Sequence, residues 1–331
     1  MHNILDINLQ LFALNTNTTT ANSEGTNDLS PEMKTYYSDY LIDNAVPKLV
    51  HDQFGQKHPI PKNGGKTIEF RKYSPLPKLL TPLTEGVTPD GQSLNVTTIE
   101  ATVAQYGGYI TLSDMLLLTA VDNNLVQATK LLGNQAGATL DTITREVLCG
   151  GTNVIYSGGV ASRSALTADM TLKVDDIKKA VRALKNQNAE KIGDSFVAVI
   201  HPDVAYDLTN DPAWQNVKDY DPKDWYEGEI GRIAGVRFVE TTEAKIFAGS
   251  GASSQAVYAT LVLGDNAYGV TEIEGGGLKH IVKQLGSGGT EDPIDQRATV
   301  GWKATKVAER LVEQFMVRIE SGSTFNPTAD N

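Results

Sequence analysis

The chain of 331 residues contains a single cysteine, Cys149, which excludes an internal disulfide and any metal site built from several cysteines. Cys149 ends a helical pattern at "REVLCGG", where a small apolar helix residue is a better interpretation than a nucleophile. No apolar run approaches the roughly twenty residues that a membrane helix needs. Residues 1–15, "MHNILDINLQLFALN", lack the basic start and the cleavage site of a signal peptide, so we expect a protein that is not secreted.

Basic residues are outnumbered as well. The 29 lysines and arginines face 40 aspartates and glutamates, which gives a net charge of -11 and a pI near 5.0. A dedicated nucleic-acid binder carries a basic stripe, so this composition argues against that class. Hydrophobic residues at 40% and charged residues at 21% are ordinary for a globular protein, and the length predicts two or three structural units.

Histidine is scarce, and none of the five histidines lies at metal-ligand spacing from another. His201 in "HPD" suggests a pair with Asp203, but no nucleophile or third ligand stands at a recognisable spacing. We therefore interpret His201 as a residue at the end of a strand or the start of a helix. The chain also lacks a Gly-x-Ser-x-Gly elbow or another nucleophile motif.

Two further motifs fail on spacing. "NGGKTIEF" includes Lys66 in the tail of a phosphate-binding loop, but Ile60 replaces the first glycine and a strand pattern follows where a helix is needed. Residues 219–229, "DYDPKDWYEGE", have Asp224 and Ile230 where a calcium loop needs glycine and glutamate, which leaves only an adventitious divalent site open. The residues thus predict no catalytic, cofactor-binding or metal site, and no enzyme.

The amino-terminal region predicts an arm and a helix. Residues 15–30 are small, polar and almost uncharged, which is typical of a flexible segment. Ser30 is a candidate helix cap with Pro31 in the first turn, and Pro47 is expected to kink or divide the helix. Its apolar face is formed by Tyr37, Leu41, Ile42, Ala45 and Leu49.

A long excursion without a helix follows, because prolines recur between His58 and Leu112. "GGKTIEFRKY" predicts one strand and "SLNVTTIEATVAQYGGYITL" its longer partner, and the apolar residues change parity near Gly107-Gly108, which predicts a bulge or bend there. Ordering each residue costs about 1 to 2 kcal/mol, and a two-stranded ribbon buries too little surface to offset this. We therefore expect contacts from outside the ribbon.

Ser113 and Asp114 then predict a helix start, as a cap and an acid in the first turn. Residues 122–124 are expected to divide the pattern into a short helix and a long one of about 39 Å, from Asn124 to Cys149, which Gly150-Gly151 ends. The apolar face comprises Leu118, Val121, Leu125, Ala128, Leu132, Ala136, Leu140, Ile143 and Val147.

The rest of the chain predicts a mixture of helices and strands. Asp175-Asp176 opens a helix whose apolar residues are Ile177, Ala180, Val181 and Leu184 and whose solvent side carries Lys178, Lys179, Arg182 and Lys185. "SFVAVIHPDVAYDL" predicts a buried strand and a short helix, and "GRIAGVRFVET" and "ATLVLGDNAYGVTEI" predict further strands. The segments 274–277 and 286–289 predict glycine-rich loops around "LKHIVKQL", and strands are favoured over a short helix at the end.

The order of these elements resembles the major capsid proteins of tailed bacteriophages, most closely the phage N4-like major capsid family. The resembling stretches span most of residues 60–320 and are "LTEGVTPDGQ", "VAQYGGYITLSD", "HPDVAYDL", "GRIAGVRFVET", and "EDPIDQRATVGWKA" leading to "MVRIES". The resemblance implies an α+β, HK97-like capsid fold. It also implies these parts: an amino-terminal arm and helix at 1–56, an extended β-hairpin loop at 57–112, a peripheral domain at 113–172 with its spine helix at 124–149, an axial domain at 173–290, and a return to the peripheral domain at 291–331.

The same resemblance implies a non-catalytic subunit that assembles as hexamers and pentamers into an icosahedral head around the double-stranded DNA genome of a tailed phage or prophage. It implies scaffold, portal and decoration proteins as partners, no cofactor, no membrane and no sequence-specific DNA contact. Localisation would be the virion capsid, assembled in the host bacterial cytoplasm. An encapsulin-type nanocompartment shell is the alternative, and a phage tail or adhesin module is a further one.

Overall fold

A computed structural model describes residues 50–73, 76–88, 90–120, 124–218, 231–287 and 292–331. The predicted arm, the helix predicted from Ser30 and the acidic segment 219–229 lie outside these residues. The chain divides into two compact units. Of the described residues, those within 105–137 and 276–304 form the small unit, and those within 50–104, 138–275 and 305–331 form the large unit.

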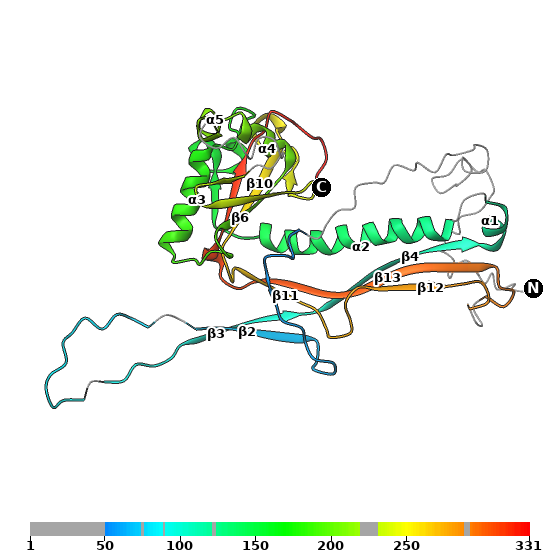
Figure 1. Cartoon of the computed structure of the whole chain (residues 1–331), viewed down its shortest axis with the longest axis horizontal. Coiled ribbons are helices and arrows are strands. Elements are labelled where there is room, and N and C mark those ends of the chain that lie inside the picture. Colours follow the sequence, from blue (N-terminus) through cyan, green and yellow to red (C-terminus); the bar gives the residue numbers. More distant parts are fainter. Residues whose placement is uncertain (1–49, 74–75, 89, 121–123, 219–230, 288–291) are drawn as a thin grey trace, which may run out of the picture. The chain divides into compact units, whose positions relative to one another are not determined.

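A sheet, a short helix and the first half of a long helix form the small unit. Its elements are β4 (Ala104–Ser113), α1 (Asp114–Thr119), α2 (Asn124–Cys149), β12 (Lys279–Lys283) and β13 (Arg297–Arg310), of which β4, α2 and β13 continue into the large unit. β13 lies between β12 and β4 (Figure 1). Trp302 on β13 is buried, and its indole N–H donates to the side-chain oxygen of Gln135 on α2 at 3.2 Å, so α2 covers one face of this sheet.

A mixed sheet forms the centre of the large unit, in the order β5-β14-β10-β6-β8-β7, and β9 also pairs with β10. β10 is antiparallel to both β14 and β6, whereas β6 and β8 are parallel. The strands are β5 (Val154–Tyr156), β6 (Phe196–Ile200), β7 (Arg232–Ile233), β8 (Val236–Glu240), β9 (Ile246–Phe247), β10 (Val257–Leu263) and β14 (Met316–Ser321).

Helices cover this sheet and close its core. They are α3 (Val174–Asn186), α4 (Pro202–Thr209) and α5 (Pro212–Lys218), with single 3-10 turns at η3 (Ser157–Gly159), η4 (Arg163–Ala165), η5 (Ala252–Ser254) and η7 (Glu313–Phe315). Ile177 and Leu184 of α3 and Leu208 of α4 pack with one face of the sheet. Leu148, near the end of α2, and Tyr268 pack with the other face, so the sheet is buried on both sides.

The large unit also contains short strands and a hairpin. These are β1 (Gln56–Lys57), β2 (Thr67–Tyr73), β3 (Val96–Thr102) and β11 (Tyr268–Thr271). β1 is parallel to β11, and β11 is antiparallel to the end of β13. β2 and β3 form a separate antiparallel pair.

Several predicted elements are confirmed. The predicted long helix from Asn124 to Cys149 has the bounds of α2, and Ser113 caps α1 by accepting the backbone N–H of Leu116 at 3.3 Å. The helix at Asp175-Asp176, the buried strand with its short helix, the later strands and the strands near the carboxyl terminus are all present. No helix occurs in the described part of residues 58–112.

Two predictions are wrong. The bulge predicted at Gly107-Gly108 does not occur, because β4 runs without interruption through both glycines and the break in the long strand falls at Val103. The chain changes partner at this break, since β3 pairs with β2 and β4 pairs with β13. Leu118 was predicted on an apolar face but is 76% exposed, and Leu116 is the residue of α1 that is buried.

The sheet partners of two strands cut across the predicted boundary between residues 290 and 291. β12, at 279–283, pairs with β13. β14, at 316–321, pairs with β10 and β5 in the sheet of the large unit. Sequence order therefore does not by itself separate the two sheets.

Candidate functional site

The β2–β3 hairpin leaves apolar side chains in solvent. Its strands pair in register from Thr67 opposite Thr102 to Tyr73 opposite Val96. Residues 76–95, here called the hairpin loop, lie between these strands in the chain (Figure 1). The described residues of the loop contain no helix or strand, and all of them are exposed. Large apolar side chains therefore lie in solvent along a segment that has no core of its own.

Only the part of the hairpin next to β11 is buried. Phe70 and Ala101 are 9% and 3% exposed. Gly269 of β11 allows the Phe70 ring to approach, because a Cβ at this position would lie 2.9 Å from the ring. The backbone N–H of Val103 donates to the carbonyl of Lys66 at 2.8 Å and closes this end of the ribbon. The hairpin is thus anchored at its base and not along its loop.

The free energy that burial of these exposed side chains would contribute can be estimated. Full burial of one large aliphatic side chain contributes about 1.5 to 3 kcal/mol. A two-stranded ribbon alone is marginal in water, so a contiguous apolar set of this kind indicates a contact surface. The exposed set of the loop and the start of β3 is Leu76, Leu79, Leu80, Leu83, Val87, Leu94 and Val96, with exposures from 48% to 85%.

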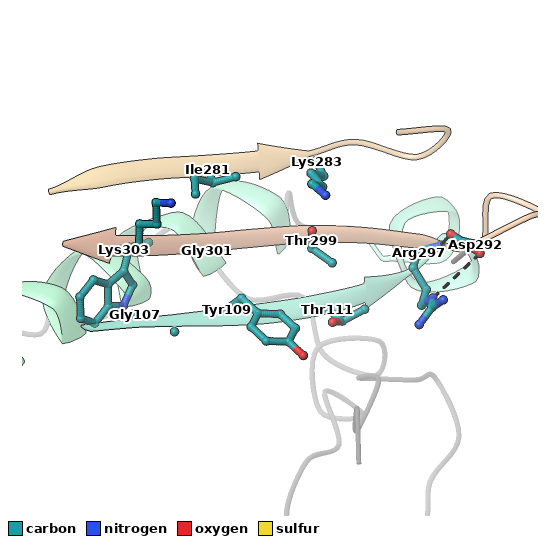
Figure 2. Close-up of a pocket in the computed structure, with 12 residues that line it drawn as sticks. Gly107, Tyr109, Thr111, Ile281, Lys283, Asp292, Arg297, Thr299, Gly301 and Lys303 are labelled. Carbon is teal, nitrogen blue, oxygen red and sulfur yellow. Dashed lines mark hydrogen bonds and ion pairs between the residues drawn. The ribbon is translucent and has the colours of Figure 1, made fainter. Parts of the chain in front are cut away.

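The small unit also exposes apolar side chains. They are Tyr109, Met115, Leu118, Leu131, Leu278, Ile281, Val282, Leu285 and Ile294, with exposures from 39% to 76%. Residues of β4, β12 and β13 line a hollow of about 430 Å³. Tyr109 and Ile281 are among its lining residues (Figure 2). Each unit therefore offers its own surface for contact with another molecule.

A buried polar network fixes the segment that leads into the hairpin. The backbone N–H of His51 donates to one oxygen of Asp141 at 2.8 Å, and His51 Nδ1 lies 2.7 Å from the other. Lys306 Nζ contacts the Asp52 carboxylate and donates to the carbonyl of Leu140 at 2.8 Å. Burial lowers the pKa of Lys306, and the nearby Asp52 charge opposes this shift.

These contacts attach residues 51 and 52 to α2 and β13 within the large unit. Thr144 of α2 adds a hydrogen bond from its hydroxyl to Asp52 at 2.6 Å. Removing one partner of a buried ion pair costs about 3 to 5 kcal/mol, because the remaining charge is left uncompensated. The network therefore holds the chain firmly ahead of β1, upstream of the hairpin.

The residues tested for chemistry in the sequence take structural positions. Cys149 is buried at the end of α2, and burial raises the pKa of its thiol to about 12, which opposes formation of a nucleophilic thiolate. His201 caps α4, as predicted: its Nδ1 accepts the backbone N–H of Asp203 at 3.2 Å. Lys66 lies in the turn before β2, where its carbonyl accepts the Val103 bond.

Within the described ranges, neither a metal-binding cluster nor a helix that could span a membrane is present. No cluster of three or more His, Cys, Asp or Glu side chains there is arranged to hold a metal ion. None of the helices in the same ranges is both long and apolar enough to span a bilayer.

Solved structures share this fold. The capsid of Ralstonia phage GP4 matches with a TM-score of 0.68 and 15% identity, covering 93% of this chain and 100% of that one. The capsid of cyanophage P-SCSP1u matches with a TM-score of 0.68 and 14% identity over 88% and 93% of the two chains. The capsid of cyanophage Pam1 has a TM-score of 0.65 and 14% identity over 95% and 99%. The fold is thus the HK97-like fold of phage capsid subunits, with many strands and few helices.

The family follows from the sequence match. The phage capsid protein family matches residues 96–315, and the chain belongs to this family. Its function is that of a major capsid protein, a structural subunit of a phage shell in the virion. A search of curated proteins gave no match.

Two features of the structure were not predicted from sequence patterns: the buried polar network and the strand β12. The buried network joins Asp52 to Lys306, which are 254 positions apart, and no local pattern reports such a pair. The strand β12 was not predicted within "LKHIVKQL", although Ile281 and Val282 form a short β-branched run between glycine-rich segments, which is typical of a strand.

Proposed function

We propose that this chain assembles with copies of itself into the icosahedral head of a tailed phage or prophage, which encloses a double-stranded DNA genome. The observation that carries the proposal is the hairpin loop, whose Leu79 and Leu80 are 79% and 85% exposed. A neighbouring copy would bury these side chains and pair the open edges of β2 and β3. The role is structural and non-catalytic.

A head-to-tail contact of this kind explains how one chain builds a closed object. Repeating the same contact about an axis closes a ring, which gives hexamers and pentamers. The small unit supplies further exposed apolar residues, such as Leu118 and Ile294, for contacts between rings. Both surfaces are needed because a ring that uses only one of them does not extend into a shell.

We further propose roles for the parts of the chain. Residues 57–112 act as the extended loop, 113–172 as a peripheral domain with α2 as its spine helix, and 173–290 as the axial domain, with 291–331 returning to the peripheral domain. Residues 1–56 serve as the arm and helix. Strand pairing favours two amendments: β12 goes with β13 in the peripheral sheet, and β14 goes with β10 in the axial sheet.

Within the family, we place the chain in the N4-like branch on the resemblance of "VAQYGGYITLSD" and "EDPIDQRATVGWKA". Scaffold, portal and decoration proteins are the partners that such a head requires. Assembly takes place in the host bacterial cytoplasm before the head joins the virion. The DNA inside is enclosed without sequence-specific contacts.

Electron microscopy of the expressed full chain, alone and with its neighbouring genes, tests the proposal. We expect icosahedral particles. A stable monomer or trimer under all these conditions would contradict the shell and favour a tail or adhesin module. Particles that load an enzyme through a separately encoded docking peptide, and no DNA, would assign the chain to an encapsulin-type compartment.

A further inference from the structure

One face of the small-unit sheet concentrates positive charge. Lys279 and Lys303 lie directly opposite each other on β12 and β13, and Lys283 lies opposite Thr299. These lysines alternate with the strand residues that pack toward α2, so they share the outer face, and all three are exposed. Figure 2 shows Lys283 and Lys303 along the hollow that this face lines.

This arrangement has an electrostatic cost that no ion pair among the described residues offsets. Like charges directly opposite each other on neighbouring strands are destabilising, by up to about 1 kcal/mol. In the part of the chain that the structure describes, the ion pairs do not include Lys279, Lys283 or Lys303. The chain as a whole has a net charge of -11, so a face with three lysines outside the described ion pairs is unusual for this chain and indicates a function. Binding of an anionic partner is such a function.

The hollow beside the lysines suits phosphate groups. Its floor has no side chains at Gly107, Gly108 and Gly301, and a Cβ at Gly301 would lie only 2.9 Å from Tyr109 Cβ. Hydroxyl groups of Thr111 and Thr299 line it together with the exposed Tyr109. The lining also includes the carboxylate of Asp292, whose charge is offset by the Arg297 guanidinium at 3.9 Å. Lysine, threonine and tyrosine are among the residues that contact phosphate oxygens in complexes with DNA.

We propose that this face, defined by Lys279, Lys283 and Lys303, binds the phosphate backbone of duplex DNA without sequence preference. The inference rests on the proposed function, since it makes the enclosed genome the ligand. Per copy, binding to three phosphates is weak and sensitive to salt. Many copies facing one DNA molecule add their contacts, so the genome is held although the shell as a whole is acidic.

The hairpin loop of a second copy fits this face less well. The described charges of the loop are those of Lys78, Glu85 and Asp90, which sum to -1, against three lysines on the face. The loop also exposes four leucines between Leu76 and Leu83, whereas Ile281 is the one aliphatic side chain among the residues that line the hollow. Charge therefore favours a polyanion over the loop.

The experiment measures binding of the full chain to a short fluorescent duplex by anisotropy, over a series of salt concentrations starting near about 50 mM. The variant K279Q/K283Q/K303Q removes the basic face. The matched control K178Q/K185Q/K191Q removes the same charge from exposed lysines elsewhere, in or just after α3. The variant K279R/K283R/K303R keeps the charge.

We expect the first variant to bind about tenfold more weakly at low salt, and the slope of log K against log salt to fall in magnitude by about 2.7, or 0.9 for each lost phosphate contact. The control and the arginine variant should bind within about twofold of the unaltered chain. Equal loss in the first variant and the control, or no binding by the unaltered chain at low salt, would overturn the proposal. Thermal melts check that all variants fold.

Two further measurements distinguish DNA binding from binding of a second copy, and distinguish this inference from the proposed shell function. The first uses a synthetic peptide of residues 76–95 as a competitor. If this peptide displaces the duplex and its affinity for the chain is higher than that of the duplex, the face belongs to a second copy and DNA is overturned as the ligand. Particle formation is scored independently by microscopy. If the glutamine variant forms particles as well as the unaltered chain while losing DNA binding, both proposals stand. If the unaltered chain forms no particles but DNA binding follows the lysines, the shell proposal fails and the assignment of the basic face to DNA phosphates stands.

Discussion

Glu313 illustrates what a single side chain does at the end of α2. Its carboxylate accepts the hydroxyl of Thr152 at 2.7 Å and also contacts the Thr152 backbone N–H. The backbone bond, and then the hydroxyl bond, hold the pKa of Glu313 below its usual range. Both bonds close the turn that follows the glycines Gly150 and Gly151.

A pH dependence follows from this shift. Because the pKa of Glu313 is lower in the folded chain than its ordinary value of 4.5, the unfolded chain binds more protons in this pH range. The stabilisation from the Glu313 carboxylate is therefore fully present above pH 4.5 and is lost as the pH falls through the lowered, folded-state pKa. The variant E313Q should therefore have a lower melting temperature than the unaltered chain at neutral pH, with a gap that closes in acid. Calorimetry from neutral pH to about pH 3 measures this gap.

The control is E85Q, which changes an exposed glutamate of the hairpin loop. Its melting temperature should follow that of the unaltered chain at each pH. A gap for E313Q that stays constant down to acid pH would show that the Thr152 bonds do not depend on the carboxylate charge.

Residue roles that depend on neighbours in sequence could be predicted, and those that depend on distant residues could not. Ser113 and His201 were placed at helix starts because capping follows from local sequence. The pairing of His51 with Asp141 was not predicted, because the two are 90 positions apart. Only the fold brings such groups together.

At the scale of elements, the glycines of β4 have a different role from the one predicted. A change of apolar parity near Gly107 was interpreted as a bulge, but the parity changes because the chain leaves the β2–β3 pair at Val103 and joins β13. Gly107 is needed for close approach, since a Cβ there would lie 2.7 Å from the carbonyl oxygen of Trp302. Periodicity locates such a change of partner but does not distinguish it from a bulge.

The substitution G107A tests this role. The added methyl group would force β4 away from β13, and we expect a loss of about 1 to 3 kcal/mol in the free energy of unfolding. Urea unfolding followed by tryptophan fluorescence measures the loss. The control is G91A, in the hairpin loop, where a Cβ would meet nothing within 4 Å. Equal stability of G107A and G91A would contradict the close approach.

Long, regular elements were the most predictable part of the fold. The bounds of α2 followed from its repeated apolar positions and from the glycines after Cys149. The partners of β12 and β14 were not predicted, because strand pairing depends on contacts between segments far apart in the chain. The sheet of the large unit therefore could not be assembled from the sequence alone.

On the scale of the whole molecule, the hairpin loop has exposed leucines that its own chain does not cover. The variant L79S/L80S/L83S should remain folded, because these side chains are 75% to 85% exposed and contribute little to the core. Its particles should be fewer by about tenfold or more, since each lost leucine removes about 1.5 to 3 kcal/mol of burial per contact. Sedimentation and electron microscopy measure the yield.

The matched control is T81A/T84A/T88A, which changes polar residues of the same loop and keeps its leucines. It should assemble as the unaltered chain does. Normal particle yield from the serine variant would mean that the loop leucines do not form the assembly contact.

Hydrogen exchange on the hairpin, compared between dilute monomers and assembled particles, tests most directly whether the loop is completed by another copy. We predict that amides of residues 76–96 exchange rapidly in the monomer, where those of α2 are protected, and become protected in particles. Equal and strong protection of this segment and α2 in verified monomers would show that the chain stabilises its own hairpin, and would contradict assembly through this loop.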